Sequence, residues 1–115
     1  MIIKYECTNI SLKNPKALAE FYQKLGAPCQ VNGENYDGFR IGNLNESYIC
    51  VWDENKWGKS TAGQITSVFK VDDLQKTYLE MVEKGIQASP PKTTVWGGQE
   101  LTLEDPDGNK IILLL

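Results

Sequence analysis

The 115-residue chain contains no histidine. Histidine is the commonest metal ligand and the usual general base near neutral pH, and it activates the serine or cysteine of many catalytic pairs. Its absence excludes every Ser-His and Cys-His nucleophile pair. A metal site or an acid–base mechanism in this chain would have to rely on other side chains.

Cysteine is scarce, and its spacing is uninformative. Cys7, Cys29 and Cys50 form an odd set without C-x-x-C spacing, so neither a disulfide framework nor a zinc knot is expected. We expect three reduced thiols that pack as small apolar groups, as is typical of a cytoplasmic protein. Without an activating histidine, Cys7 and Cys50 are poor candidates for a nucleophile.

The chain also lacks a basic excess and long apolar runs. Its 12 Lys and Arg residues against 15 Asp and Glu give a net charge of −3, which disfavours nucleic acid as a partner. The longest apolar run, residues 111–115, is far too short to cross a membrane, and the N-terminus does not resemble a signal peptide. We expect one cytoplasmic domain, residues 1–115, with no nucleic-acid or membrane partner.

The chain begins with a strand followed by a helix. Residues 2–12 alternate in polarity and predict a strand. Asn14 is a good N-cap, Pro15 suits the first helical position, and Gly26 suits the residue after the helix. An apolar stripe at helical spacing supports the helix: Leu18, Phe21, Tyr22 and Leu25.

The second half repeats this order. Residues 65–71 predict a strand, and Asp73 and Gly85 lie 59 residues after Asn14 and Gly26. Polar residues 53–63 are expected to form a loop, and Asn32-Gly33 a hairpin turn. Further short strands are expected at residues 36–41, 47–52, 93–96, 100–104 and 110–115. Two βαβββ units of this size would be too small to be stable alone, so we expect them to pair.

The last two strands flank residues 105–109, D-P-D-G-N, which predict a tight turn. Together with the repeat, this turn makes the chain resemble the vicinal oxygen chelate superfamily, which includes glyoxalases, bleomycin-resistance proteins and extradiol dioxygenases. The resemblance is carried by residues 12–15 (L-K-N-P), Phe21-Tyr22, Leu25-Gly26, residues 71–74 (V-D-D-L), Gly85, residues 96–98 (W-G-G) and residues 105–109.

The resemblance implies an α+β fold of two βαβββ modules, with mixed sheets curled around a cleft and helices outside. The modules are expected at about residues 1–54 and 62–115, joined by a linker at about residues 55–61. The modules would close on each other within one chain or be exchanged between two chains, and the linker permits either.

Enzymes of the superfamily bind a divalent metal through one residue from each of four strands, usually His, Glu or Gln. The resemblance places these positions at Cys7, Thr66, Ile112 and either Cys50 or Trp52. These thiol, hydroxyl, alkyl and indole groups do not form a site for a hard or borderline divalent ion. We therefore expect no metal and no cofactor.

Strand alternation predicts an apolar and aromatic cleft face with a few hydrogen-bonding groups, as in small-molecule pockets. Trp57 and Trp96 would lie at its rim and stack on a planar ligand, although Trp96 also suits a purely structural role. Tyr48 and Trp52 would alternatively fill the cleft themselves or be covered by a partner chain. The ligand-binding candidates are Cys7, Asn9, Tyr48, Cys50, Trp52, Trp57, Thr66, Val68, Trp96 and Ile112.

The missing metal ligands make the chain most similar to the metal-free bleomycin-resistance branch. That branch implies a homodimer that binds or sequesters a small molecule, planar or cationic, and does not transform it. An acidic rim at Asp53-Glu54 agrees in sign with a cationic ligand. The alternatives are a glyoxalase-like lyase or isomerase with a displaced or absent metal site, and a structural or regulatory dimer.

Overall fold

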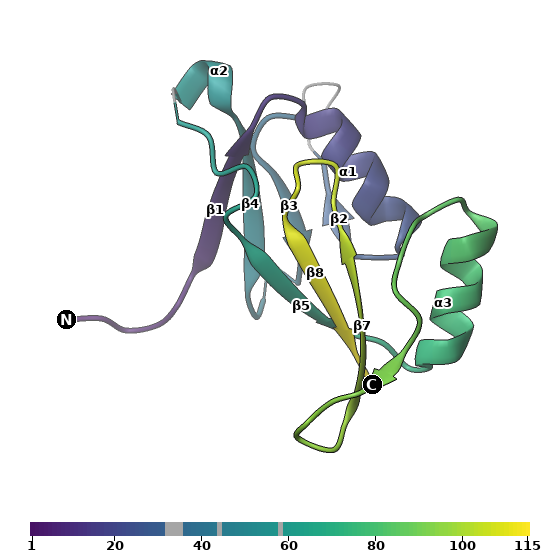
Figure 1. The fold of residues 1–115 in the computed structure, drawn as a ribbon. Helices are drawn as coiled ribbons and strands as arrows, with labels where there is room; N and C mark the ends of the chain where they lie inside the picture. Colours follow the sequence, from purple (N-terminus) through teal and green to yellow (C-terminus); the bar gives the residue numbers. More distant parts are fainter. Residues whose placement is uncertain (32–35, 44, 58) are drawn as a thin grey trace. The chain divides into compact units, whose positions relative to one another are not determined.

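The computed structural model describes residues 1–31, 36–43, 45–57 and 59–115. For Trp57 it describes the backbone but not the side chain. The chain divides into two compact units, Met1–Ala62 and Gly63–Leu115, which are described one at a time (Figure 1). The turn predicted at Asn32-Gly33 lies outside the described residues. Within the described parts of the chain, no helix is long and apolar enough to span a membrane.

The first unit has one four-stranded mixed sheet and a helix on one of its faces. Its elements are β1 (Cys7–Leu12), α1 (Pro15–Lys24), β2 (Cys29–Gln30), β3 (Phe39–Gly42) and β4 (Tyr48–Asp53). The strand order is β1-β4-β3-β2, in which β1 and β4 are parallel and the other neighbours antiparallel.

This unit differs from the sequence prediction at three places, one of which is the strand predicted at residues 36–41, which begins at Phe39 after a turn. The first strand begins at Cys7 rather than at residue 2, because its partner β4 begins at Tyr48, directly opposite Cys7. Residues before Cys7 therefore have no ladder partner, and they extend away from the sheet as an exposed segment (Figure 1). The expected loop after β4 opens with a short helix, α2 (Glu54–Trp57).

The core of the first unit lies between α1 and the sheet. Asn14 caps the helix by accepting a hydrogen bond from the Ala17 backbone N–H at 3.1 Å, and Gly26 follows the helix at a φ of +80°. The apolar stripe of α1 meets the sheet side chains that point toward it. The buried residues are Ile10, Leu12, Leu18, Ala19, Tyr22, Phe39, Ile41 and Val51.

The second unit has the same topology. Its elements are β5 (Thr66–Lys70), α3 (Leu74–Glu83), β6 (Lys92–Thr93), β7 (Gln99–Glu104) and β8 (Lys110–Leu114). The strand order is β5-β8-β7-β6, with β5 and β8 parallel. Its buried apolar residues are Leu74, Met81, Leu101, Leu103, Ile111 and Leu113.

The repeat predicted from the sequence is confirmed by equivalent residues in the two units. Asp73 caps α3 through a 3.0 Å hydrogen bond from the Lys76 N–H, as Asn14 caps α1, and Gly85 takes a φ of +72° where Gly26 takes +80°. The fold class is therefore α+β, with two βαβββ units whose sheets each remain open. Pairing of the two units into one domain stays a prediction.

Candidate functional site

One face of the first sheet carries half of the predicted ligand-binding residues. Ile10 and Leu12 of β1 point into the core. The residues that alternate with them, Cys7, Asn9 and Ser11, therefore point to the opposite, open face. The parallel register pairs these residues with alternate residues of β4. The open face thus brings together the candidates Cys7, Asn9, Tyr48, Cys50 and Trp52, with Ser11 between them.

A pocket of about 380 Å³ opens near the C-terminal end of β1. This volume lies within the range of small-molecule sites, about 300–1,000 Å³. The lining combines the Trp52 indole with amide, hydroxyl and ammonium groups, and it is also bordered by Ile10, whose side chain points into the core. It consists of Asn9, Ile10, Ser11, Trp52, Lys59 and Thr61.

The chain returns to β1 after α2, and this return builds the wall of the pocket. The Thr61 N–H donates to the Ser11 carbonyl at 2.9 Å, and the Ser11 N–H donates to Thr61 Oγ1 at 3.0 Å. These bonds satisfy the free edge of β1 at this residue, since β4 occupies its other edge. They also place Lys59, two residues earlier in the chain, beside Ser11 and Trp52 in the lining.

Ser11 is a nearly buried hydroxyl that faces the pocket. The residue is only 9% exposed, and its hydroxyl has no hydrogen-bond partner among the described residues. None of the described residues has a buried side-chain oxygen or nitrogen without a partner, so the Ser11 hydroxyl itself is still reachable from the pocket. Ser11 therefore offers a donor and an acceptor to whatever occupies the pocket.

Trp52 is oriented by the backbone of Gly38. A Cβ built on Gly38 would lie 3.3 Å from Cζ3 of the indole, so the absence of a side chain allows the ring to lie close to the chain. Gly38 is held in turn by its N–H, which donates to the Val51 carbonyl at 2.7 Å. The indole is half-buried and supplies the aromatic part of the lining.

The other end of the open face is polar and charged. The Arg40 guanidinium lies over the Tyr48 ring, 5.2 Å from its centroid, and the Tyr48 hydroxyl donates to Glu6 at 3.3 Å. Partial burial and the neighbouring Glu6 carboxylate raise the pKa of Tyr48. The Lys4 ammonium, 3.1 Å from Glu6, lowers the pKa of that carboxyl. Tyr48 is thus engaged with its neighbours and does not line the pocket.

The two thiols of the open face are held by their surroundings in the sheet. Cys7 Sγ donates to Asn9 Oδ1 at 3.7 Å. Cys50 is buried, and burial, with the neighbouring Cys7, raises its pKa, although Arg40 opposes the shift. A thiol with a raised pKa is a weak nucleophile at neutral pH, so neither the geometry nor the electrostatics activates Cys50.

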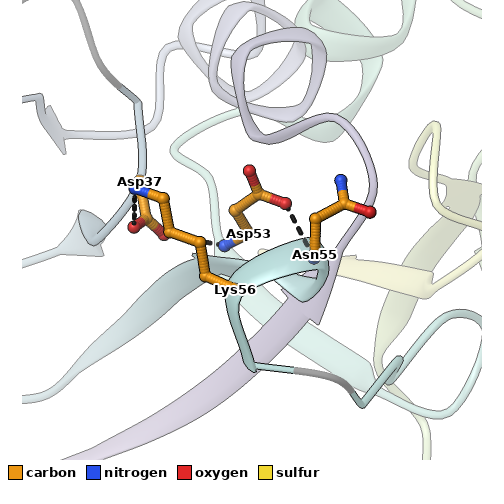
Figure 2. A network of polar contacts seen from close by, with 4 residues as sticks. All are labelled: Asp37, Asp53, Asn55 and Lys56. Atoms are coloured by element: carbon orange, nitrogen blue, oxygen red, sulfur yellow. Dashed lines mark hydrogen bonds and ion pairs between the residues drawn. The ribbon is translucent and has the colours of Figure 1, made fainter.

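Asp37 and Asp53 are engaged in local structure around the end of β4. Figure 2 shows Asp37 accepting hydrogen bonds from the Asp53 N–H at 2.7 Å and from Lys56 Nζ at 2.9 Å. These two bonds lower the pKa of Asp37. The Asp53 carboxylate accepts from the Asn55 N–H at 2.9 Å and so caps α2. Neither Asp53 nor Glu54, the predicted acidic rim, lines the pocket.

The remaining candidates lie in other parts of the chain. Thr66, Val68 and Ile112 share the open face of the second sheet, where Val68 pairs with Ile112 and is 56% exposed. Trp96 lies between β6 and β7 with its ring against Gly98, and it is 63% exposed. The side chain of Trp57, in α2, is outside the described residues.

Sequence reasoning missed Lys59, Thr61 and Gly38. Lys59 and Thr61 lie in the stretch that was predicted as a loop, and only the hydrogen bonds to Ser11 bring them to β1. Gly38 lies at a φ of +77° in the turn before β3. A glycine beside Asp37 signals a turn, but not contact with a tryptophan far along the chain.

The positions that the resemblance assigns to the superfamily's metal carry side chains that are poor ligands for a divalent cation. Ile112 has no donor atom, Thr66 offers a neutral hydroxyl, and the Cys50 thiol is kept protonated by burial. Across the described residues, His, Cys, Asp and Glu side chains form no group of three that could hold a metal. No chemical step through a metal is derived from this donor set.

Two βαβββ units in one chain define the class of vicinal oxygen chelate folds. The sequence profile of the Glyoxalase/Bleomycin resistance protein/Dioxygenase superfamily matches residues 6–113, and the chain belongs to this superfamily. Among curated proteins, a sequence search finds no match.

Solved structures of the same fold include three named for resistance or antibiotic binding. A bleomycin resistance determinant encoded on the transposon Tn5 has a TM-score of 0.71 and 21% identity, with 97% of each chain covered. A bleomycin-binding protein complexed with bleomycin has a TM-score of 0.69 and 20% identity, with 98% of each covered. TnmS3, an antibiotic binding protein from Streptomyces sp. CB03234, has a TM-score of 0.74 and 20% identity, with 99% of this chain and 97% of that chain covered. At these identities the likeness shows the fold alone.

Proposed function

We propose that this protein binds a small planar molecule in the pocket beside β1 and sequesters it without transforming it. The observation that carries the proposal is the pocket itself, which joins the Trp52 indole to the unpartnered hydroxyl of Ser11. An apolar wall with a few convergent polar groups is the usual composition of a small-molecule site. The bleomycin-binding and antibiotic-binding proteins that share the fold support a ligand of antibiotic size.

The lining favours binding over catalysis. Among the described residues, Lys59 is the only titratable side chain of the pocket, and the other side chains on the open face are amide, hydroxyl and indole groups. A pair of groups that could donate and accept a proton at neutral pH is therefore not assembled there. This composition supports sequestration and disfavours a lyase or isomerase activity.

We further propose that the protein acts as a homodimer. The open face of the second sheet carries apolar side chains that a partner would cover, with Val68 56% exposed and Ile112 beside it. Sedimentation equilibrium should give a dimer mass. A monomer at micromolar concentration would contradict this part of the proposal and leave ligand binding untouched.

The binding proposal is tested by thermal shift against a library of planar antibiotics, bleomycin included. A ligand should raise the melting temperature, and mass spectrometry should recover it unchanged after prolonged incubation. Trp52→Ala should abolish the shift, whereas Trp96→Ala, which alters a tryptophan outside the pocket, should preserve it. A chemically altered compound would instead favour an enzyme, and a library without any hit would contradict the proposal.

A further inference from the structure

The charge of the pocket is opposite in sign to that of the chain. The chain carries a net charge of −3, but within the described residues the only charged side chain that lines the pocket is Lys59. Mobile ions in solution screen exposed charges over about 8–10 Å, so a nearby ammonium group outweighs distant carboxylates. A ligand in this pocket therefore meets a local positive charge.

Lys59 is available as a counter-ion. Two ion pairs of the described residues join Lys4 to Glu6 and Lys56 to Asp37, and neither involves Lys59. The nearest acidic residues in the sequence, Asp53 and Glu54, are not part of the lining. The Lys59 ammonium is exposed at the pocket with no carboxylate of the described residues paired to it.

Ser11 supplies a second, independent indication. Ser11 lies in the same lining and is 9% exposed as a residue, and its hydroxyl, which is not a buried atom without a partner, makes no hydrogen bond to the other described residues. A hydroxyl donates readily to a carboxylate oxygen, and bonds to an ionised acceptor are about twice as strong as neutral ones. An ammonium and an unpaired hydroxyl in one lining form a recognition site for an anionic oxygen group.

We propose that the pocket selects flat aromatic ligands that carry a carboxylate. The ring system packs against Trp52, and the carboxylate binds Lys59 and accepts a hydrogen bond from Ser11. This assignment rests on the proposed function and narrows its ligand class to carboxylates. It also differs from what the acidic composition of the chain would favour by itself, which is a cation.

The test compares three probes of one shape by isothermal titration calorimetry: 2-naphthoate, neutral 2-naphthamide and cationic 2-naphthylmethylammonium. Naphthoate should bind tightest, by roughly three- to tenfold over the amide, because a charge-assisted contact at an exposed lysine contributes modestly. Its advantage should shrink as salt is raised. Tighter binding of the cation would overturn the assignment.

Variants distinguish the contribution of the Lys59 charge from that of the rest of the pocket. Lys59→Gln should remove the naphthoate preference, Lys59→Glu should reverse it toward the cation, and Ser11→Ala should weaken naphthoate more than naphthamide. Lys76→Gln, an exposed lysine of α3, changes the net charge equally and should leave the preference intact.

Two outcomes distinguish the carboxylate assignment from the proposed function. Equal binding of all three probes, lost in Trp52→Ala but unaffected by Lys59→Gln, would overturn the carboxylate assignment and retain the pocket. No binding by any probe would overturn the carboxylate assignment, while a hit from the antibiotic library would still support sequestration.

Discussion

Gly38 lies against the indole of Trp52, so closely that an added Cβ would approach Cζ3 to 3.3 Å. The two residues are far apart in sequence, but the turn before β3 brings the glycine beside the end of β4. Gly38 is thus a positioning residue for the aromatic wall of the pocket, and it acts through contact with Trp52.

Replacing Gly38 should impair both stability and ligand binding. Gly38→Ala should lower the free energy of unfolding by about 1–2 kcal/mol, because φ is +77°, a conformation that alanine adopts reluctantly. The new methyl group should also displace Trp52 and weaken ligand binding several-fold, as measured by calorimetry.

Gly26→Ala is a matched control for this substitution. Gly26 has a similar φ of +80°, but a Cβ there would meet nothing within 4 Å. This variant should lose stability and keep its ligand affinity. Equal loss of affinity in both variants would refute the positioning role of Gly38.

Asp37 should make the stability of the first unit dependent on pH. Hydrogen bonds from the Asp53 N–H and Lys56 lower the pKa of Asp37 below its ordinary value of 3.8. A carboxyl whose pKa is lowered by folding stabilises fully above its unfolded pKa, and this contribution disappears as the pH falls through the folded pKa.

Asp37→Asn should therefore cost about 1–2 kcal/mol at pH 7, and the difference from the parent should shrink below about pH 4. Urea unfolding of both proteins from pH 3 to pH 7 measures this difference in the free energy of unfolding. Asp72→Asn, at an exposed carboxylate, should have little effect at any pH. If the loss of unfolding free energy in Asp37→Asn does not vary with pH, the negative charge of Asp37 is not the source of its stabilising effect.

The fold was readable from the sequence because its signals are local. Asn14 and Asp73 cap helices through bonds to backbone groups three residues away, and Gly26 and Gly85 end them at positive φ. Strand alternation likewise placed Asn9 and Trp52 on a common face. Each of these features depends on a few consecutive residues, which a single sequence displays.

The candidate pocket depends on long-range contacts, and only part of its lining could be predicted from the sequence. Lys59 and Thr61 line the pocket because the chain returns to the edge of β1, where Thr61 forms hydrogen bonds with Ser11. No local sequence pattern predicts this contact. The length of the first strand was wrong for the same reason, since it is set by where β4 begins. Composition suggested a cationic ligand, whereas our proposal of an anionic ligand depends on Lys59, which no local pattern places at the pocket.

Cys50 should be an unreactive thiol. It is 6% exposed, and its raised pKa leaves little thiolate near pH 8. Iodoacetamide should modify it far more slowly in the folded protein than in urea-unfolded protein, as followed by peptide mass spectrometry. Cys7, which is half-buried, provides the internal comparison. Modification of Cys50 ahead of Cys7 in the folded protein would contradict its role as a packing group.

Asn109 connects the turn of the last hairpin to the neighbouring strand. Its side chain is almost fully buried, at 1% exposure, and its Oδ1 accepts from the Ile65 N–H at 3.1 Å. Its own N–H donates to Asp105 Oδ1 at 2.9 Å, which closes the turn. One residue therefore joins the start of β5 to the start of β8.

Asn109→Ala should lower the free energy of unfolding by about 1–2 kcal/mol, because the part-buried Ile65 N–H loses its acceptor. The Asp105 bond to the backbone survives the substitution, so the hairpin should still form, and hydrogen exchange should show the loss of protection concentrated at Ile65 and β5. Gln87→Ala, which removes an exposed amide in the same unit, should change stability by less than about 0.5 kcal/mol. Equal stability of Asn109→Ala and the parent would show that the turn acts through its backbone alone.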